Sequence, residues 1–201
     1  MDFSKERSRL NEILLADIDI RNKKNEILEI ITELIVCINY NQNHPAHIYN
    51  LYDHIIETTS KVNPNLILKL SALLHDIGKP NAVVLIDGVN RYWGHEEIGA
   101  IISRQVLTRL GYNKELIDQV FTMIKYHDHK TFSTIESVEN TVNLVGKDLA
   151  PYLFQLQRAD LLSHSKKYYK ALLPKLNAAI KIYEDNLDYF NGRSKLIADD
   201  I

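Results

Sequence analysis

The sequence has little of what disulfide-bonded or turn-rich proteins need. Among 201 residues there are one cysteine, Cys37, and only seven glycines and five prolines. A single cysteine cannot form a disulfide within the chain, so a disulfide scaffold is excluded and we expect a cytoplasmic protein. The scarcity of glycine and proline disfavours a turn-rich β-sandwich and favours helices.

Long hydrophobic runs and an excess of one charge are missing as well. Every apolar stretch is far shorter than the roughly 18 residues of a membrane-spanning helix, and the charged start MDFSKERSRLNE lacks the apolar centre of a signal peptide. Lysine and arginine number 24 against 26 aspartate and glutamate residues, which gives a net charge of −2. We expect no membrane and no duplex DNA as a partner, because duplex binding needs a basic surface.

The apolar residues that are present recur at helical spacing. The expected helices cover residues 25–38, 46–60, 64–76, 95–110, 113–128, 135–146, 148–164 and 166–190. Ile48 in the second helix is expected on the inner side. Asn63 as N-cap and Pro64 at the first helical position predict the start of the third helix, and Pro174 predicts a kink in the last.

Two segments differ from this pattern. Residues 82–93 hold β-branched and aromatic residues around Asp87-Gly88, a turn signal that predicts a short hairpin or an ordered loop. Residues 1–24 are polar and charged and are expected to form an N-terminal arm. The remaining residues, 25–201, are expected to fold as a single all-α domain, a bundle of about seven or eight helices.

Histidines and aspartates in the helical segments are the candidates for chemistry. They occur in the order His54, His75-Asp76, His95, His127 and Asp160, each within or at the end of a separate expected helix. Short loops between antiparallel helices can bring such residues together in a bundle core. Imidazole and carboxylate ligands together suit Mn, Fe, Co, Ni or Zn. Adjacent helical residues point about 100° apart, so the His75-Asp76 pair suits a carboxylate that bridges two ions, or a fraying helix end.

A plainer interpretation exists for some of these residues. A single histidine on an apolar helix face, such as His54, is usually a packed side chain with its ring nitrogens satisfied. Asp160, within LFQLQRADLLSH, is harder to explain in this way, because a buried carboxylate without a partner costs several kcal/mol. Arg158 is close in sequence, but residues two apart on a helix face different sides.

The segment LSALLHDIGKP resembles the signature of the HD-domain phosphohydrolase superfamily. The superfamily pattern maps onto YDHIIE (His54), LLHDIGK (His75 and Asp76) and LQRADLLSH (Asp160), while YWGHEEIGA (His95) and IKYHDHK (His127) resemble the extra histidines of two-metal members. Over about residues 45–165 the order of motifs resembles the HD region that follows the nucleotidyltransferase head of bacterial tRNA CCA-adding enzymes. The paired carboxylates and Gly-Ser loop of that head are absent from this sequence, so nucleotide addition is not implied.

The resemblance implies an HD-domain helical bundle with one or two divalent ions, drawn from Mn, Fe, Mg, Co, Ni and Zn. The implied metal ligands are His54, His75, Asp76, His95, His127 and Asp160. Asp76 is also expected to be catalytic, by bridging the ions or orienting the nucleophile, together with Lys79, which would offset phosphoryl charge. The alternative for Lys79 is an exposed loop lysine. The expected substrate-binding residues are Lys79, Arg91, His129 and His164.

Other polar and aromatic residues near these motifs have simpler expected roles. His44 and His47 are assigned to helix capping or packing. Trp93 is assigned to the core rather than to a stacking platform for bases. Asp128 either orients His127 or is solvated.

The function implied by the resemblance is that of a metal-dependent phosphohydrolase, either a phosphomonoesterase or a phosphodiesterase. Its expected substrate is a nucleotide, a cyclic phosphate, an RNA end or another small phosphate ester. Two alternatives stay open: a di-iron oxygenase of the same fold, and a non-catalytic regulatory module that binds metal or nucleotide. A homodimer formed through the tyrosine-rich residues 168–190 also stays open.

Overall fold

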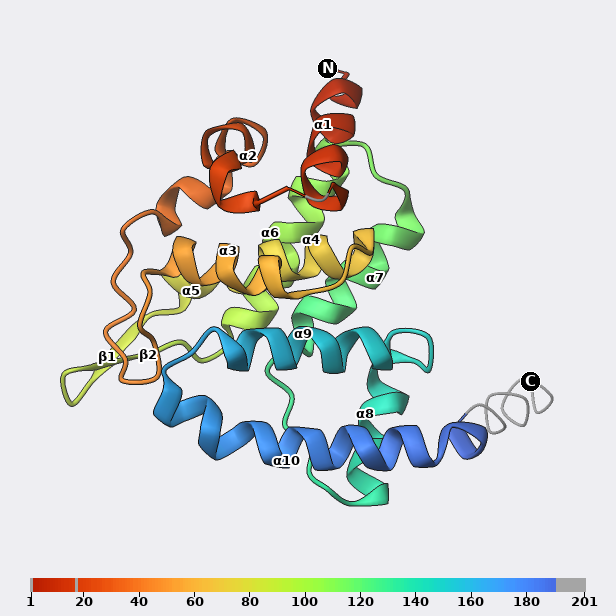
Figure 1. Ribbon diagram of the computed structural model, residues 1–201. Coiled ribbons are helices and arrows are strands. Elements are labelled where there is room, and N and C mark those ends of the chain that lie inside the picture. Colours follow the sequence, from red (N-terminus) through yellow and green to blue (C-terminus); the bar gives the residue numbers. More distant parts are fainter. Residues whose placement is uncertain (1, 17, 191–201) are drawn as a thin grey trace.

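The protein is an all-α bundle with one small hairpin, as shown by a computed structural model that describes residues 2–16 and 18–190 (Figure 1). The elements are α1 (Ser4–Leu15), η1 (Ile20–Lys23), α2 (Lys24–Ile30), η2 (Thr32–Cys37), α3 (Leu51–Lys61), α4 (Leu66–Leu74), α5 (Lys79–Ala82), β1 (Val84–Ile86), β2 (Val89–Arg91), α6 (His95–Arg109), α7 (Lys114–Lys125), α8 (Ile135–Val145), α9 (Ala150–Leu162) and α10 (Lys166–Asp185). The all-α prediction is confirmed. In the described part, ten α-helices and two 3₁₀ helices replace the expected seven or eight. Helices α1, η1 and α5 lie outside the expected segments, and the expected helix 25–38 is divided into α2 and η2.

The N-terminal segment is one source of the extra helices. In place of a polar arm, α1 buries Leu10, Ile13 and Leu14 in the core. Its outer face is also attached to the domain, because the hydroxyl of Tyr112 donates a hydrogen bond to Asn11 Oδ1 at 2.6 Å. The prediction failed because the three buried apolar residues of α1 stand among many charged ones and give only a narrow hydrophobic stripe.

Capping residues explain where two expected helices begin. The side chain of Asn50 accepts a hydrogen bond from the backbone N–H of Asp53, so α3 begins at Leu51. Ile48 precedes this cap and is 62% exposed, which contradicts its expected place on the inner side. Asn65 caps α4 in the same way, two residues after the expected Asn63 cap.

Helix α4 lies between two groups of buried apolar residues. On one side, Leu70, Leu73 and Leu74 pack with residues of α1, α3, α6 and α7. On the other side, Leu68 and Ala72 pack with residues of α8, α9 and α10, the helices drawn below α4 in Figure 1. A helix that is apolar on nearly all sides is buried on all sides. The chain that leaves its C-terminal end, at His75, therefore starts in the centre of the molecule.

The expected hairpin is present. Strands β1 and β2 pair antiparallel, and the turn residues Asp87 and Gly88 both have positive φ, as a two-residue type I′ turn requires. Asn43 ties the hairpin to the preceding loop, since its carbonyl accepts from the Asn90 N–H and its side chain donates to the Gly88 carbonyl. Among the described residues, no helix has the length and apolar character needed to cross a membrane.

Candidate metal centre

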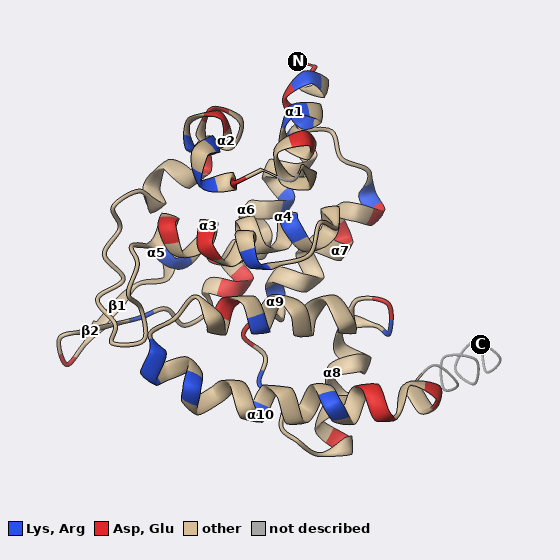
Figure 2. Cartoon of the chain, viewed as in Figure 1, with Lys and Arg blue, Asp and Glu red and all other residues tan. Residues whose placement is uncertain are grey.

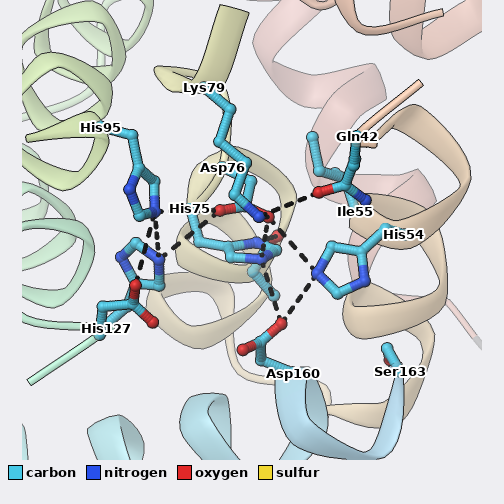
Figure 3. Close-up of polar contacts among 12 residues, drawn as sticks. Gln42, His54, Ile55, His75, Asp76, Lys79, His95, His127, Asp160 and Ser163 are labelled. Carbon is cyan, nitrogen blue, oxygen red and sulfur yellow. Dashed lines mark hydrogen bonds and ion pairs between the residues drawn. The ribbon is translucent and has the colours of Figure 1, made fainter. Parts of the chain in front are cut away.

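Five separate segments bring the expected ligands to one buried point (Figure 3). They are His54 on α3, His75 and Asp76 directly after α4, His95 at the start of α6, His127 just after α7, and Asp160 on α9. Their ligand atoms form two groups, each with one atom per residue and with all atoms of a group within 4.8 Å of one another.

The first group consists of His54, His75 and Asp160. The Oδ1 atom of Asp160 lies 2.8 Å from His54 Nε2 and 3.6 Å from His75 Nε2. The Oδ2 atom of Asp76 lies 3.4 Å from His54 Nε2 and 3.2 Å from His75 Nε2. Two imidazole nitrogens thus face two carboxylates.

The second group consists of Asp76, His95 and His127. Here the other carboxylate oxygen, Asp76 Oδ1, lies 3.3 Å from His95 Nε2 and 3.7 Å from His127 Nε2. Figure 3 shows Asp76 between these two histidines on one side and His54 with Asp160 on the other. The two oxygens of Asp76 therefore belong to different groups, as expected for a carboxylate that bridges two ions.

Backbone carbonyls select which nitrogen of each ring faces the cluster. The Nδ1 atoms of His75, His95 and His127 lie 2.7–2.8 Å from carbonyl oxygens three residues earlier, those of Ala72, Tyr92 and Ile124. A neutral imidazole has one N–H, and a carbonyl can only accept, so that proton is on Nδ1. Each Nε2 then presents a lone pair to the cluster, the usual arrangement of a metal-binding histidine.

This arrangement fits a cation. His95 Nε2 and His127 Nε2 are only 3.2 Å apart, so two lone pairs face each other next to the Asp76 carboxylate. The first group contains buried polar atoms that make no hydrogen bond, namely Nε2 of His54 and His75 and Oδ1 of Asp160. Unpaired acceptors that converge in a buried place cost free energy unless a positive charge lies among them.

The pKa values of the same residues reflect this need for positive charge. Burial alone would lower the pKa of His75, but the nearby carboxylates of Asp76 and Asp160 outweigh it and raise the pKa to about 10. Burial would raise the pKa of Asp76, yet His75 and Lys79 hold it well below its ordinary value. The pKa of Asp160 is likewise held low, against burial, by His164 and His54. Both carboxylates are therefore charged at neutral pH.

Gly78, in the segment His-Asp-Ile-Gly-Lys, allows α6 to approach the cluster. A Cβ atom at this position would overlap the carbonyl oxygen of His95 and lie 2.6 Å from the backbone nitrogen of Gly99. The φ angle of Gly78 is −78°, so the position needs glycine for lack of space and not for an unusual backbone conformation. This close approach brings His95 to Asp76.

Lys79 is buried at the edge of the cluster and is not the exposed loop lysine of the alternative prediction. Its Nζ lies 2.6 Å from Asp76 Oδ2 and donates a hydrogen bond to Gln42 Oε1 at 3.0 Å. The Gln42 backbone carbonyl accepts a further hydrogen bond from the Tyr92 hydroxyl. Sequence reasoning missed Gln42, because a polar residue within NYNQNHP carries no pattern that distinguishes it from a solvated one.

A pocket of about 1050 Å³ opens beside the cluster. Of the expected substrate-binding residues, Arg91, His129 and His164 line it together with Lys79. His44 and His47 line it too, although His44 also has the local role expected of it, since its Nδ1 accepts from the Ala46 N–H.

The structure also tests the expectations for Trp93, which was assigned to the core, and for Asp128, which had two alternative roles. Trp93 lines the pocket and is 71% exposed, which contradicts its expected place in the core. Asp128 is exposed, and its Oδ2 lies 3.9 Å from His95 Nε2, not against His127.

A scan against models of protein families matches residues 43–165 to the HD domain, which is more than half of the chain and includes all six expected ligands. This chain belongs to the HD domain family. The HD domain family consists generally of metal-dependent hydrolases, and the two ligand groups of this HD domain agree with a divalent metal centre.

Two curated relatives of this HD-domain chain are tRNA nucleotidyltransferases. The A-adding tRNA nucleotidyltransferase of Deinococcus radiodurans is 28% identical over 121 residues, which cover 57% of this chain and 28% of that protein. The CC-adding tRNA nucleotidyltransferase of Thermus thermophilus is 33% identical over 97 residues, which cover 47% of this chain and 22% of that protein. The chain thus spans about a quarter of the length of these relatives, in agreement with the resemblance to their HD region.

Proposed function

We propose that this HD-domain protein is a phosphohydrolase with two divalent ions, which releases phosphate from a phosphomonoester or opens a cyclic phosphodiester. The observation that carries the proposal is Asp76, whose two oxygens face two separate groups of imidazole nitrogens. His54, His75 and Asp160 would hold one ion, His95 and His127 the other, and Asp76 both. Ions bound in this way supply a nucleophile at neutral pH and polarise a phosphoryl oxygen.

The protein's own groups have separate tasks in this proposal. The carbonyl contacts of His75, His95 and His127 keep these rings in the tautomer that presents Nε2. Lys79 extends from the start of α5 to Asp76 and also lines the pocket, so its ammonium group lies between the ligand cluster and the space open to substrate. Fixed positive charge at that point stabilises the charge that develops on a phosphoryl group.

The proposed substrate is a nucleotide-like phosphate, with a phosphate at an RNA end or a 2′,3′-cyclic phosphate preferred. The support is the similarity to tRNA nucleotidyltransferases, which covers 57% of this chain for one relative and 47% for the other. The histidines and the single buried lysine around the pocket suit a phosphate group that is bound in a small space next to the ions.

Metal analysis of the purified protein, followed by a phosphate-release screen with Mn, Fe, Mg, Co, Ni and Zn, tests the proposal. The expected result is close to two ions per chain and turnover of a phosphate ester with at least one of these metals. Two irons with a visible absorption band and no phosphate release would instead support oxygen chemistry. Bound metal without turnover of any ester would support the regulatory module.

Replacing Lys79 with alanine should lower kcat/KM by about 10-fold to 1000-fold, because a charge contact worth about 1.4–4 kcal/mol in the transition state is lost. The metal content should not change, since Lys79 is not a ligand. The matched control is Lys125→Ala, which removes a lysine that is paired with Glu97 at the surface near His127. Wild-type kinetics for Lys79→Ala would contradict a catalytic role for this lysine.

A further inference from the structure

The outer rim of the pocket, called the pocket mouth below, carries exposed aromatic and cationic side chains. A small phosphate ester does not need them for binding. Exposed aromatic side chains line the mouth from three segments: Trp93 after β2, Phe132 between α7 and α8, and Tyr168 on α10. Trp93 and Phe132 are 71% and 66% exposed, and neither belongs to a buried apolar cluster. Large aromatic groups left in water at a pocket mouth are typical of surfaces that stack on a ligand.

The same three segments each add an exposed cation to the pocket lining. They are Arg91 on β2, Lys130 before α8 and Lys175 on α10. Lys130 and Lys175 form no ion pair with any residue between 2 and 190 that the structure describes, and Arg91 Nη1 lies 3.2 Å from Nε2 of the His44 ring. Burial and the positive charge of Arg91 lower the pKa of His44, so this ring is neutral at pH 7 and Arg91 keeps its full positive charge.

The acidic residues of the pocket lining lie next to the histidines of the ligand cluster. Glu96 and Asp128 both lie against His95, although the charge of Asp128 also reaches Tyr168 on α10. The first half of α10 carries four lysines and no acidic residue, and Figure 2 shows its Asp and Glu only near the other end. An otherwise acidic protein thus presents local positive charge next to its pocket.

We infer that the pocket mouth binds the phosphorylated end of a single-stranded nucleic acid, because three segments each place one aromatic and one cationic side chain around it. This inference rests on the proposed function, in which the terminal phosphate reaches the metal centre. Single-strand binding combines cationic groups that contact the backbone with aromatic rings that stack on successive bases. The pocket volume of about 1050 Å³ is at the upper limit of small-ligand sites and leaves room for more than one nucleotide.

The test uses Trp93, the only tryptophan of the chain, as an intrinsic fluorophore. The full-length, metal-loaded protein is titrated with a 5′-phosphorylated RNA tetranucleotide, its DNA equivalent, UMP and tripolyphosphate. Both tetranucleotides should quench Trp93 and bind at least about 10-fold more tightly than UMP or tripolyphosphate, because only they can stack several bases. For three phosphate contacts, the logarithm of the binding constant should fall against the logarithm of salt concentration with a slope of about −2.

Two variants separate the contribution of base stacking to binding from the contribution of positive charge. Phe132→Ala should weaken tetranucleotide binding by roughly 5-fold to 100-fold, the range found for loss of one stacked base. Its matched control is Leu85→Ala on the hairpin, which is 65% exposed and outside the pocket. Lys175→Glu should weaken binding and make the salt slope shallower, whereas Lys5→Glu on α1 should do neither. These variants should hydrolyse a small phosphate ester at the wild-type rate.

Three results would overturn the inference. The first is equal affinity for UMP, tripolyphosphate and the tetranucleotides. The second is an equal effect of Phe132→Ala and Leu85→Ala on binding. The third is a dimer in sedimentation that Phe132→Ala dissociates, which would make the aromatic residues an interface between two copies. The binding data do not depend on turnover, so tight tetranucleotide binding without hydrolysis would count against the proposed function alone.

Discussion

Asp76→Asn should yield a folded protein with little bound metal and with kcat/KM lowered by at least about 100-fold. Loss of an outer-shell partner of a metal ligand typically costs 10-fold to 100-fold in metal affinity or activity, and Asp76 contacts both ligand groups directly. An amide keeps the shape of the side chain but removes the negative charge and one of the two oxygens that face the groups. Metal content per chain and phosphate release are the two measurements.

Asp53→Asn is the matched control for this variant. Asp53 is an exposed carboxylate on α3, directly before His54, and its side chain contacts Asn50 instead of the cluster. It should leave metal content and kinetics unchanged. Full metal occupancy in Asp76→Asn would refute the assignment of Asp76 as the bridging ligand, whatever the activity.

Gly78→Ala should destabilise the fold by at least about 2 kcal/mol, because the new Cβ would overlap the His95 carbonyl and cannot be relieved by rotating a side chain. The relief must come from a shift of α6, which carries His95 away from Asp76. We therefore expect a lower urea midpoint and, in the protein that remains folded, loss of the metal held by His95 and His127.

Gly99→Ala makes the comparison specific to position 78. A Cβ on Gly99 would approach its nearest neighbours at 3.4 Å, a tight contact that small shifts can absorb. We expect it to change stability by less than half as much as Gly78→Ala. If both variants unfold at the wild-type urea concentration, α6 does not pack on this turn as the structure shows.

The residues of the cluster could be picked out from the sequence because each belongs to a distinctive local pattern. His75 and Asp76 end an aliphatic helix, and Asp160 interrupts another apolar run, so each is conspicuous where it stands. The order of these residues along separate helices allowed them to converge, and the resemblance to the HD-domain superfamily implied that they do. The fold class followed from the same helical spacing.

The features that the sequence did not predict depend on tertiary contacts. Gln42 becomes significant only because a loop places it 3.0 Å from Lys79, and no local pattern marks that contact. Trp93 was expected in the core because aromatic residues usually pack there, but the turn after β2 holds it at the pocket mouth. Ile48 was assigned to a helix face that does not exist, because the Asn50 cap delays the start of α3.

The position of the ligand cluster between the two groups of packed residues links metal binding to folding. His95 and His127 border helices α6 and α7 of one group, while Asp160 lies on α9 of the other, and Asp76 lies between them. A ligand that binds only the folded state adds its binding free energy to the stability of that state. Bound ions would therefore act as cross-links between the halves of the bundle, and part of the cohesion of the molecule would vary with the free metal concentration around it.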